Sequence, residues 1–368
     1  MNAFQKMLYE ALFSLTKEGE VFYFQDFTLD GKVYRIFNYR LASYTEFMKP
    51  GALECRGVMF EVNGDEAVRL ASLPIAKFFN LNENPSTMGL DLTQVVGIEE
   101  KADGSLMSTY LHNGELRLKS KGSLFSDQAL AAMKWLDRHA NEAFKADLLT
   151  LTRHDNTINL EWCSPEHRIV LGYMEPTLKV LNIRVNESGV YHPMTSAWVP
   201  YSVQNVQVDD PVAFVASIPS MTDIEGFVLL MANGQRIKIK TEWYLSLHHA
   251  KDSVNNPRRL FECILEEGVD DLRSMFSADP LAMRLIDEMQ IKVNHLYNNM
   301  VKMVEDYYVE NKDLSRKDYA IKAQVHFKDT LYFGLAMEKY INRPFSYKEF
   351  LKGKWRDLGL KDTSLSDE

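Results

Sequence analysis

The chain has 368 residues, a formal net charge of −9 and an ordinary globular composition, with 46% hydrophobic and 25% charged residues. This length is enough for two domains with cores of normal size. The acidic balance excludes a protein that is basic throughout, so any site for a polyanion must be a local basic patch. The three cysteines are widely spaced and form no C-x-x-C pair, which indicates neither a disulfide framework nor a zinc site and fits a reducing cytoplasm.

The first part of the chain has the sequence pattern of a sheet-rich domain. The N-terminal residues 1–20 have helical spacing broken by charge, without an apolar run long enough for a signal peptide or a membrane span. From about residue 20 to 245, four Asp-Gly or Asn-Gly pairs (30–31, 63–64, 113–114 and 233–234) each separate two strand-like runs. Such pairs favour hairpin turns between antiparallel strands. Residues 127–147 interrupt this pattern with a predicted helix.

After about residue 246 the spacing of apolar residues becomes helical. Asn256-Pro257 and Asp279-Pro280 both combine a capping side chain with proline in the first turn, which predicts two helix starts. We therefore predict an α+β fold, with an antiparallel-sheet domain over residues 1–248 and an all-α domain over residues 249–368. The polar tail 361–368 is expected to be frayed.

Alternating cations mark two of the predicted strands, whereas P-loop, dinucleotide-binding, zinc-protease and serine-hydrolase motifs are all missing. Period two places each set of three on one strand face: Arg117, Lys119 and Lys121 in "RLKSK", and Arg236, Lys238 and Lys240 in "RIKIK". Each strand alone is more simply a solvated edge strand. Glu161 and Glu225, however, lie in or beside apolar runs and need a partner such as a lysine or a metal ion. Taken together, these residues favour an anion-binding site.

Lys101 lies between "GIEE" and the turn-forming "ADGS". It could be an ordinary hairpin lysine in solvent, or a nucleophile whose neutral form is favoured by burial and by nearby cations. Period two predicts that Glu99 shares the face of Lys101 and that Glu100 lies on the opposite face.

The sequence around Lys101 resembles a known family. "KADGS" fits the K-x-D-G motif of covalent nucleotidyltransferases, which include DNA ligases, RNA ligases and mRNA capping enzymes. Four positions are a weak signal, but "ECRG", "KSKGS", "NLEW", "IEGFV" and "KIK" follow in the family's order. Over about residues 33–250, longer stretches such as "RIFNYRLASY", "AKFFNLNENP", "RIVLGY" and "RIKIKTEWYLSLH" resemble the ATP-dependent RNA ligase 1 family of T-even phages, the tRNA-repair ligases. The OB-fold domain of DNA ligases has no evident counterpart.

The resemblance implies a nucleotidyltransferase domain followed by an all-helical domain that selects the RNA. It implies that Lys101 attacks the α-phosphorus of ATP, that the AMP moves to the 5′-phosphate of RNA, and that a 3′-hydroxyl then displaces AMP. ATP would be the co-substrate, with Mg²⁺ neutralising phosphate charge. The implied partner is a tRNA nicked in its anticodon loop, whose two RNA ends the enzyme would join. The enzyme is expected to be a monomer in the cytoplasm of a phage-infected bacterium.

The resemblance also implies roles for single residues. Lys238 and Lys240 match lysines that hold the α-phosphate, Arg56 a ribose-side contact and Lys77 a phosphate contact. The remaining positions are implied as follows: Tyr39 a nucleotide contact, Lys121 an essential lysine, Glu161 and Glu225 essential acids for ribose or metal, Tyr244 an activity-critical position, Gly104 the tight turn after Lys101, Glu99 an adenine contact, and Asp270 a metal ligand. For Lys77, Tyr39 and Asp270 the alternatives are a surface lysine, a core tyrosine and a solvated acidic turn.

Three alternatives to the RNA ligase are compatible with part of this sequence. A capping-type guanylyltransferase or a DNA ligase would use the same lysine chemistry, and a non-catalytic RNA-binding protein could share the fold. The lack of an OB-like C-terminal region argues against the two enzymes, and the full set of motif residues argues against the third. Residues 339–361 mix basic and aromatic side chains, which suits either RNA stacking or an amphipathic helix that packs on its neighbours.

Overall fold

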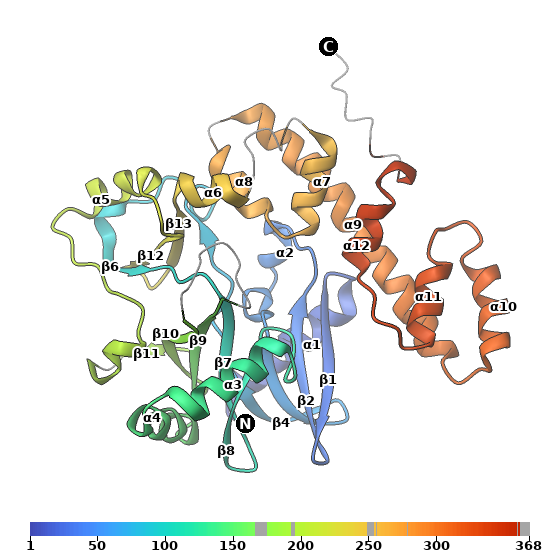
Figure 1. Cartoon of the computed structure of the whole chain (residues 1–368), viewed down its shortest axis with the longest axis horizontal. Helices are drawn as coiled ribbons and strands as arrows, with labels where there is room; N and C mark the ends of the chain where they lie inside the picture. The colour runs from blue at the N-terminus through green and yellow to red at the C-terminus, as the bar shows by residue number, and fades with distance from the viewer. Residues whose placement is uncertain are drawn as a thin grey trace. The chain divides into compact units, whose positions relative to one another are not determined.

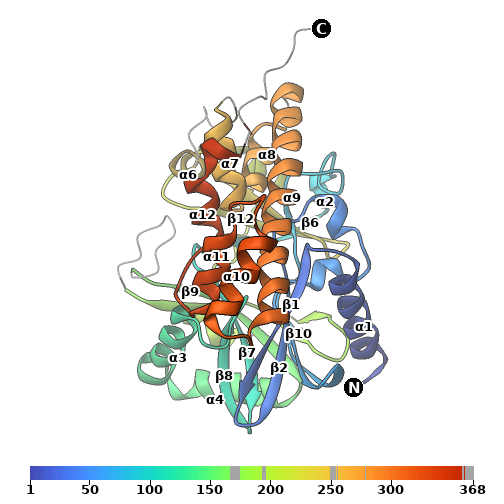
Figure 2. The same cartoon turned by 90° about the vertical axis from the view of Figure 1, so that its right-hand side faces the viewer.

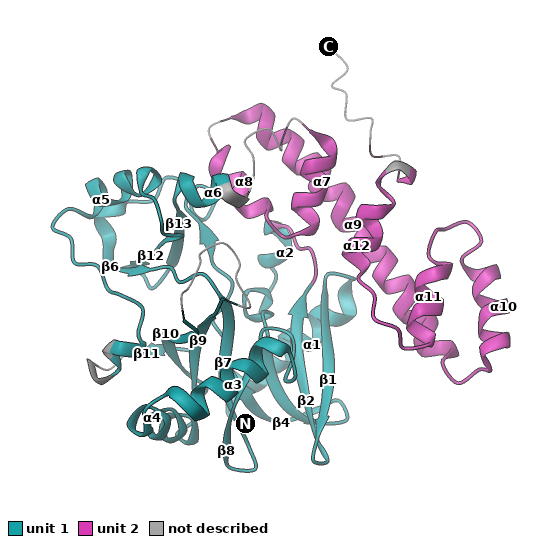
Figure 3. Cartoon of the chain, in the orientation of Figure 1, with its two compact units in different colours: residues 1–39, 44–250 teal, residues 40–43, 251–368 magenta. Residues whose placement is uncertain are grey.

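The computed structural model describes residues 1–165, 175–192, 196–248, 254, 256–277, 279–358 and 360. The chain divides into two compact units, residues 1–39 with 44–250 (unit 1) and residues 40–43 with 251–368 (unit 2) (Figure 3). Residues 40–43 belong to unit 2 because Leu41 joins its apolar core and accepts a hydrogen bond from Asn298 Nδ2 at 3.2 Å. Residue 249, where we predicted the second domain to begin, the "RIVLGY" stretch and the tail 361–368 lie outside the described residues.

The described residues of unit 1 form three sheets. Their strands are β1 (Phe22–Leu29), β2 (Lys32–Tyr39), β3 (Val58–Asn63), β4 (Glu66–Ser72), β5 (Phe79–Asn80), β6 (Val95–Glu100), β7 (Ser105–His112), β8 (Glu115–Ser120), β9 (Asn156–Cys163), β10 (Thr177–Val185), β11 (Tyr191–His192), β12 (Gly226–Met231) and β13 (Arg236–Lys240). The strand orders are β1-β2-β3-β4, β11-β10-β9-β7-β8 and β5-β13-β12-β6. The paired strands are antiparallel except β5 and β13, which are parallel.

All four predicted hairpins are confirmed: β1–β2, β3–β4, β7–β8 and β12–β13. Asp30 and Gly31 both have positive φ, 47° and 79°, as do Asn113 and Gly114, 50° and 83°. These values suit two-residue turns whose twist matches that of the flanking strands. The sequence pattern of unit 1 therefore correctly predicted which consecutive strands pair as hairpins.

Helices cover the sheets of unit 1 (Figure 1). They are α1 (Ala3–Glu18), α2 (Tyr44–Phe47), α3 (Asp127–His139), α4 (Glu142–Arg153), α5 (Pro211–Ser217) and α6 (Glu242–His248), with 3-10 turns η1 (Ala52–Glu54), η2 (Leu92–Gln94), η3 (Ser196–Tyr201) and η4 (Ile218–Ser220). α1 packs through Leu8 and Leu12 on the β1–β4 sheet, while α3 and α4 pack on the five-stranded sheet. The helix predicted over 127–147 is in fact two helices, because Asn141 caps a new start at α4.

Unit 2 is helical, as predicted. It contains α7 (Pro257–Leu265), α8 (Val269–Met275), α9 (Pro280–Asn311), α10 (Arg316–His326), α11 (Phe333–Tyr340), α12 (Tyr347–Gly353) and η6 (Trp355–Asp357). Asn256 and Asp279 cap α7 and α9, with proline at the start of each helix. Figure 2 shows α9 running along the unit with α11 and α12 packed beside it. None of the helices in the described part of the chain is both long and apolar enough to cross a membrane.

The aromatic residues of the segment 339–361 pack within unit 2. The ring of Trp355 lies 4.9 Å from that of Phe261, and the Tyr340 hydroxyl donates to Leu314 O at 2.7 Å. Lys348 and Lys352 form ion pairs with glutamates at the end of α7. Of the two interpretations of this segment, the amphipathic packing is the one that the contacts support.

Candidate active site

The pairing of β6, β12 and β13 brings three charged residues to one end of a sheet. Lys101 follows β6 directly, and its N–H donates to Gly226 O at 2.9 Å. Gly226 pairs with Lys240, the last residue of β13, and Glu225 immediately precedes β12. A Cβ at Gly226, where φ is +151°, would lie 1.9 Å from Ile239 O, so this close approach requires glycine. Residues more than a hundred positions apart in sequence thus meet through strand register.

Glu225 links the two lysines at this end of the sheet. Its Oε1 lies 2.8 Å from Lys101 Nζ and 3.3 Å from Lys240 Nζ, and the carboxylate side chain is only 3% exposed. Oε2 of Glu225 is buried and has no hydrogen-bond partner among the described residues. A buried carboxylate oxygen without a partner is costly, so it is suited to accept a hydrogen bond or to bind a cation from a ligand.

Glu161 on β9 completes the acidic part of the site. Burial raises the pKa of Glu161 to about 7, reinforced by Glu225 and Asp103 and opposed by Lys101 and Arg56. Its side chain packs against Gly104, three residues after Lys101, and its carboxyl group lies within the electrostatic reach of Lys101 and Glu225. A carboxyl group with this pKa changes charge near neutrality.

Gly104 lies where the segment after Lys101 closely approaches β9. We expected it to allow a tight turn; its φ is not positive, so a left-handed backbone is not what requires glycine here. A Cβ there would instead lie 2.3 Å from Trp162 O and 3.0 Å from Glu161 Cγ. The residue must be glycine because the segment after Lys101 packs directly on β9.

Tyr244 reaches the same site from α6. Its hydroxyl donates to Asp103 Oδ1 at 2.9 Å, both residues are buried, and Lys240 Nζ lies 5.1 Å from the centre of its ring. The tyrosine therefore orients the "KADG" segment that carries Lys101. Asp103 had no role in our sequence interpretation, although it is part of the motif.

A second group of predicted contacts lies around β2 and β5. Lys121 Nζ lies 4.4 Å from the centre of the Tyr39 ring, within cation–π distance. Lys77 Nζ lies 5.4 Å from the ring centres of Phe47 and Phe79. β5 pairs with β13 at Asn80 and Lys238, so "AKFFN" adjoins "RIKIK".

All three predicted cations lie on one strand face in β13, but only two of the three do so in β8. Along β13, Ile237 and Ile239 are buried and the cations are partly exposed, as predicted. In "RLKSK" the prediction holds for Arg117 and Lys119, which keep the two-residue spacing on β8, although Arg117 is exposed and Lys119 is fully buried. It was wrong for Lys121, which lies beyond the end of β8. α3 packs on the opposite face of β8, where Leu118 joins its apolar cluster, and Lys119 lies within the electrostatic reach of Arg56.

Two further residues with predicted roles are Glu99 on β6 and Asp270. Burial raises the pKa of Glu99, and the charge opposing that rise is Arg236. Asp270 lies in the first turn of α8, in unit 2. Among the described residues there is no group of three or more His, Cys, Asp or Glu that could hold a metal ion.

Comparison with known protein families decides which family this arrangement belongs to. A family model described as RNA ligase matches residues 54–244, which is more than half of the chain. The chain belongs to the RNA ligase family. A second model, described as T4 RNA ligase 1, C-terminal domain, matches residues 251–352 of the ligase. The predicted family is therefore confirmed.

Among curated proteins, the ligase is 28% identical over 287 residues to RNA ligase 1 of Bacteriophage TS2126, covering 74% of this chain and 70% of that protein. Two solved structures of an archaeal ATP-dependent RNA ligase are more distantly similar. Form 1 has 15% identity and a TM-score of 0.48, covering 82% of this chain and 80% of the other. Form 2 has 14% identity and a TM-score of 0.47, covering 80% and 79%.

Proposed function

We propose that the ligase uses ATP to join RNA 5′-phosphate and 3′-hydroxyl ends through a lysyl-AMP intermediate on Lys101. The observation that carries this proposal is the contact of Glu225 Oε1 with both Lys101 Nζ and Lys240 Nζ, at 2.8 and 3.3 Å, beside Glu161. Through this contact Glu225 holds the Lys101 amine in a fixed position and keeps a second cation, Lys240, next to the amine. Phosphoryl and nucleotidyl transfer depend mainly on such positioning and charge stabilisation.

In the first step the Nζ atom of the Lys101 amine forms a bond to the α-phosphorus of ATP and releases a proton to solvent. The bond from the α-phosphorus to the oxygen that bridges to the β-phosphate breaks, and pyrophosphate leaves. Glu225 orients the amine. Lys238 and Lys240 stabilise the negative charge that develops on the α-phosphate. Arg56, Tyr39 and Lys77 hold the nucleotide, as the family resemblance implies.

In the second step the AMP moves from Lys101 to the 5′-phosphate of RNA, forming a phosphoanhydride and restoring the lysine. In the third step an RNA 3′-hydroxyl attacks the 5′-phosphorus, the new phosphodiester forms, and AMP leaves. Glu161 and Lys121 are the groups we propose to hold the RNA-bound adenylate, because both lie beside predicted nucleotide contacts.

Mg²⁺ would supply charge neutralisation on the phosphates when bound. Mg²⁺ is held by oxygen ligands, commonly one or two carboxylates together with substrate phosphates and water. Glu225, with its unpartnered Oε2, and Glu161 fit that requirement. Asp270 also offers a carboxylate, but among the described residues it does not belong to a group of three potential metal ligands. A metal ion at Asp270 would therefore need water or substrate oxygens as its other ligands.

We further propose that the natural substrate is a nicked tRNA anticodon loop, that unit 2 contributes to its selection, and that the protein acts as a monomer in the cytoplasm of phage-infected bacteria. The bacteriophage origin of the RNA ligase 1 relative supports this proposal. The match of unit 2 to the C-terminal domain family of T4 RNA ligase 1 supports the role of unit 2.

The lysine chemistry is tested by incubating the protein with α-labelled ATP or GTP and Mg²⁺, followed by a denaturing gel. We expect a covalent AMP adduct with ATP that Lys101→Ala abolishes. Lys32→Ala, which removes a more exposed lysine from β2, should leave the adduct intact. An adduct with GTP alone would indicate a guanylyltransferase, and no adduct would indicate a non-catalytic RNA-binding protein; either result rejects the proposal.

A further inference from the structure

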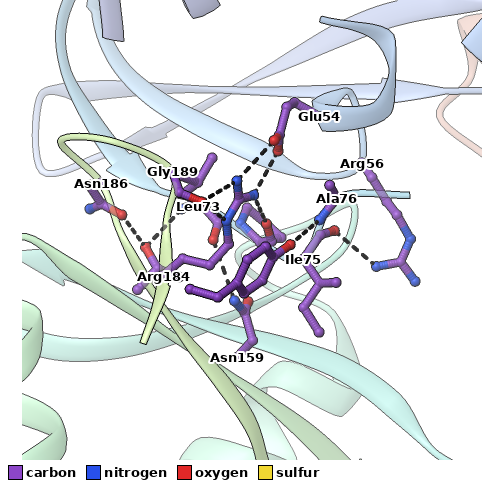
Figure 4. A network of polar contacts seen from close by, with 12 residues as sticks. Glu54, Arg56, Leu73, Ile75, Ala76, Asn159, Arg184, Asn186 and Gly189 are labelled. Atoms are coloured by element: carbon purple, nitrogen blue, oxygen red, sulfur yellow. Dashed lines mark hydrogen bonds and ion pairs between the residues drawn. The ribbon is translucent and has the colours of Figure 1, made fainter. Parts of the chain in front are cut away.

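Arg184 is a buried cation outside the group of residues just described. It lies on β10, and its side chain is 3% exposed. Its guanidinium uses all five of its N–H donors (Figure 4). Nε and Nη2 donate to Gly189 O at 3.1 and 2.9 Å, Nη1 and Nη2 donate to the Glu54 carboxylate at 2.7 and 2.9 Å, and Nη1 donates to Pro74 O at 2.7 Å.

Tyr191 extends the contacts of Arg184. The two residues are cross-strand partners of β10 and β11. The Tyr191 ring centre lies 4.7 Å from the guanidinium carbon of Arg184 and 3.7 Å from that of Arg236. The Tyr191 hydroxyl accepts a hydrogen bond from Ala76 N at 3.2 Å. One arginine and one tyrosine thus contact three separate parts of unit 1.

Each of these three parts carries a predicted nucleotide contact. Glu54 lies two residues before Arg56, Ala76 lies immediately before Lys77, and Arg236 lies two residues before Lys238 on β13. The three segments are distant in sequence, so their relative placement depends on tertiary contacts.

The segment 73–78 depends most on these contacts because it forms no helix or strand. Its backbone is held by Arg184 through Pro74 O, by Tyr191 through Ala76 N, and by Leu53 O through Lys77 N at 2.7 Å. Arg56 itself donates to Ile75 O at 3.5 Å, which ties its side chain to the same segment (Figure 4). A shift of this segment would therefore move Lys77 and disturb Arg56 together.

We propose that Arg184, acting with Tyr191, is a positioning residue for ATP. It holds the segments of Arg56, Lys77 and Lys238 at fixed distances from one another, so that all three side chains meet the nucleotide at once. This inference rests on the proposed function. Lysine cannot replace the arginine, because a single ammonium group has three donors and no planar fork to bind a carboxylate and two carbonyls together.

A purely structural role is the alternative, and the chain offers a matched control for it. Arg35 is 5% exposed, and its guanidinium donates twice to Asp26, at 2.8 Å each, and at 3.1 Å to Asp65. It also stacks on Phe24, with 3.9 Å between the guanidinium carbon and the ring centre. None of these partners adjoins a predicted nucleotide contact. Arg35→Lys should therefore cost stability as Arg184→Lys does, without affecting ATP.

The experiment measures lysyl-AMP formation against ATP concentration, with the rate expressed per active molecule. For Arg184→Lys we expect the ATP concentration at half-maximal rate to rise about tenfold, the size of losing one charge-assisted contact. Tyr191→Phe removes a single oxygen and should raise the ATP concentration at half-maximal rate about two- to tenfold. Arg35→Lys should leave the ATP concentration at half-maximal rate unchanged. In a Lys77→Ala background the effect of Arg184→Lys should shrink, because both changes weaken the same contact.

The outcomes separate this inference from the proposed function. If the wild-type protein forms no adduct, the proposed function fails. If it does, and Arg184→Lys and Tyr191→Phe retain the wild-type dependence on ATP, Arg184 has no positioning role. An equal shift for Arg35→Lys would also overturn the inference, because it would be a general effect of lost stability. Should Arg184→Lys fail to fold, Tyr191→Phe decides the question.

Discussion

Lys119 is a fully buried lysine on β8 whose amine donates to Ser120 O at 3.1 Å. Burial, together with the charge of nearby Arg56, lowers the pKa of Lys119 to about 7. In the unfolded chain a lysine has a pKa of about 10.4. Between these two values the unfolded chain binds more protons than the folded one, so the free energy of unfolding should rise with pH over about 7 to 10.

Lys119→Met removes this titration while keeping an unbranched side chain of similar length. We expect the variant to be more stable than the wild type at pH 7, by a margin that narrows as the pH rises towards 10. Urea unfolding at several pH values measures this margin. Lys32→Met, at a site 39% exposed, is the control and should show no such trend. A margin for Lys119→Met that stays constant with pH would contradict the expectation.

Single residues were predictable where a motif or a polar residue in an apolar run marked them. Lys101, Glu161 and Glu225 stood out in this way, and the structure brings all three together. Arg184 could not be found from sequence, because an arginine in a strand usually lies in solvent and its partners come from residues 54, 74 and 189. The burial of Lys119 was missed because strand periodicity does not reveal whether both faces of a strand are covered.

At the scale of elements, β13 presents Lys238 and Lys240 on one face, with Ile237 and Ile239 in the core. We expect Lys238→Ala and Lys240→Ala to fold normally, because both side chains are partly exposed and their removal leaves no cavity in the core. Each should reduce lysyl-AMP formation by about 10²- to 10³-fold, the loss typical of removing a group that stabilises transition-state charge.

Rates of adduct formation, with circular dichroism as the check on folding, test this prediction for β13. Arg117→Ala is the matched control, since it removes an exposed strand cation whose ion pair among the described residues is with Glu115, at 2.7 Å. Full activity in either lysine variant would remove that lysine from the site.

Local pairing was predictable at this scale, whereas the order of the strands was not. Turn chemistry revealed each hairpin because Asn-Gly and Asp-Gly favour positive φ. The pairing of β6 with β12 joins residues more than a hundred positions apart, and no local signal encodes it. That pairing creates the contact between Lys101 and Glu225, so the geometry of the candidate site came only from the structure.

At the scale of the whole molecule, the two units correspond to separate family models, over residues 54–244 and 251–352. Because the protein carries a net charge of −9, RNA must be attracted by local cations rather than by the whole surface. The change from strand to helix spacing predicted the helical region. Residues 40–43 were missed because their membership of unit 2 depends on tertiary contacts such as that of Leu41.

The substrate proposal belongs to this scale. We expect the protein, with ATP and Mg²⁺, to circularise a labelled single-stranded RNA that carries a 5′-phosphate and a 3′-hydroxyl. A tRNA nicked in the anticodon loop should be sealed faster than this linear RNA. Gel analysis of the labelled products measures both rates. Sealing of nicked DNA duplex alone would show that the substrate class is wrong, and equal rates would reject the tRNA preference.

The claim that Lys101 is the nucleophile is tested most directly by locating the nucleotide on the protein. The protein is incubated with ATP and Mg²⁺ without RNA, digested, and its peptides are analysed by mass spectrometry. The account predicts AMP on the Nζ atom of Lys101, lost when 5′-phosphate RNA is added. AMP on another residue, such as Lys119 or Lys240, would contradict it.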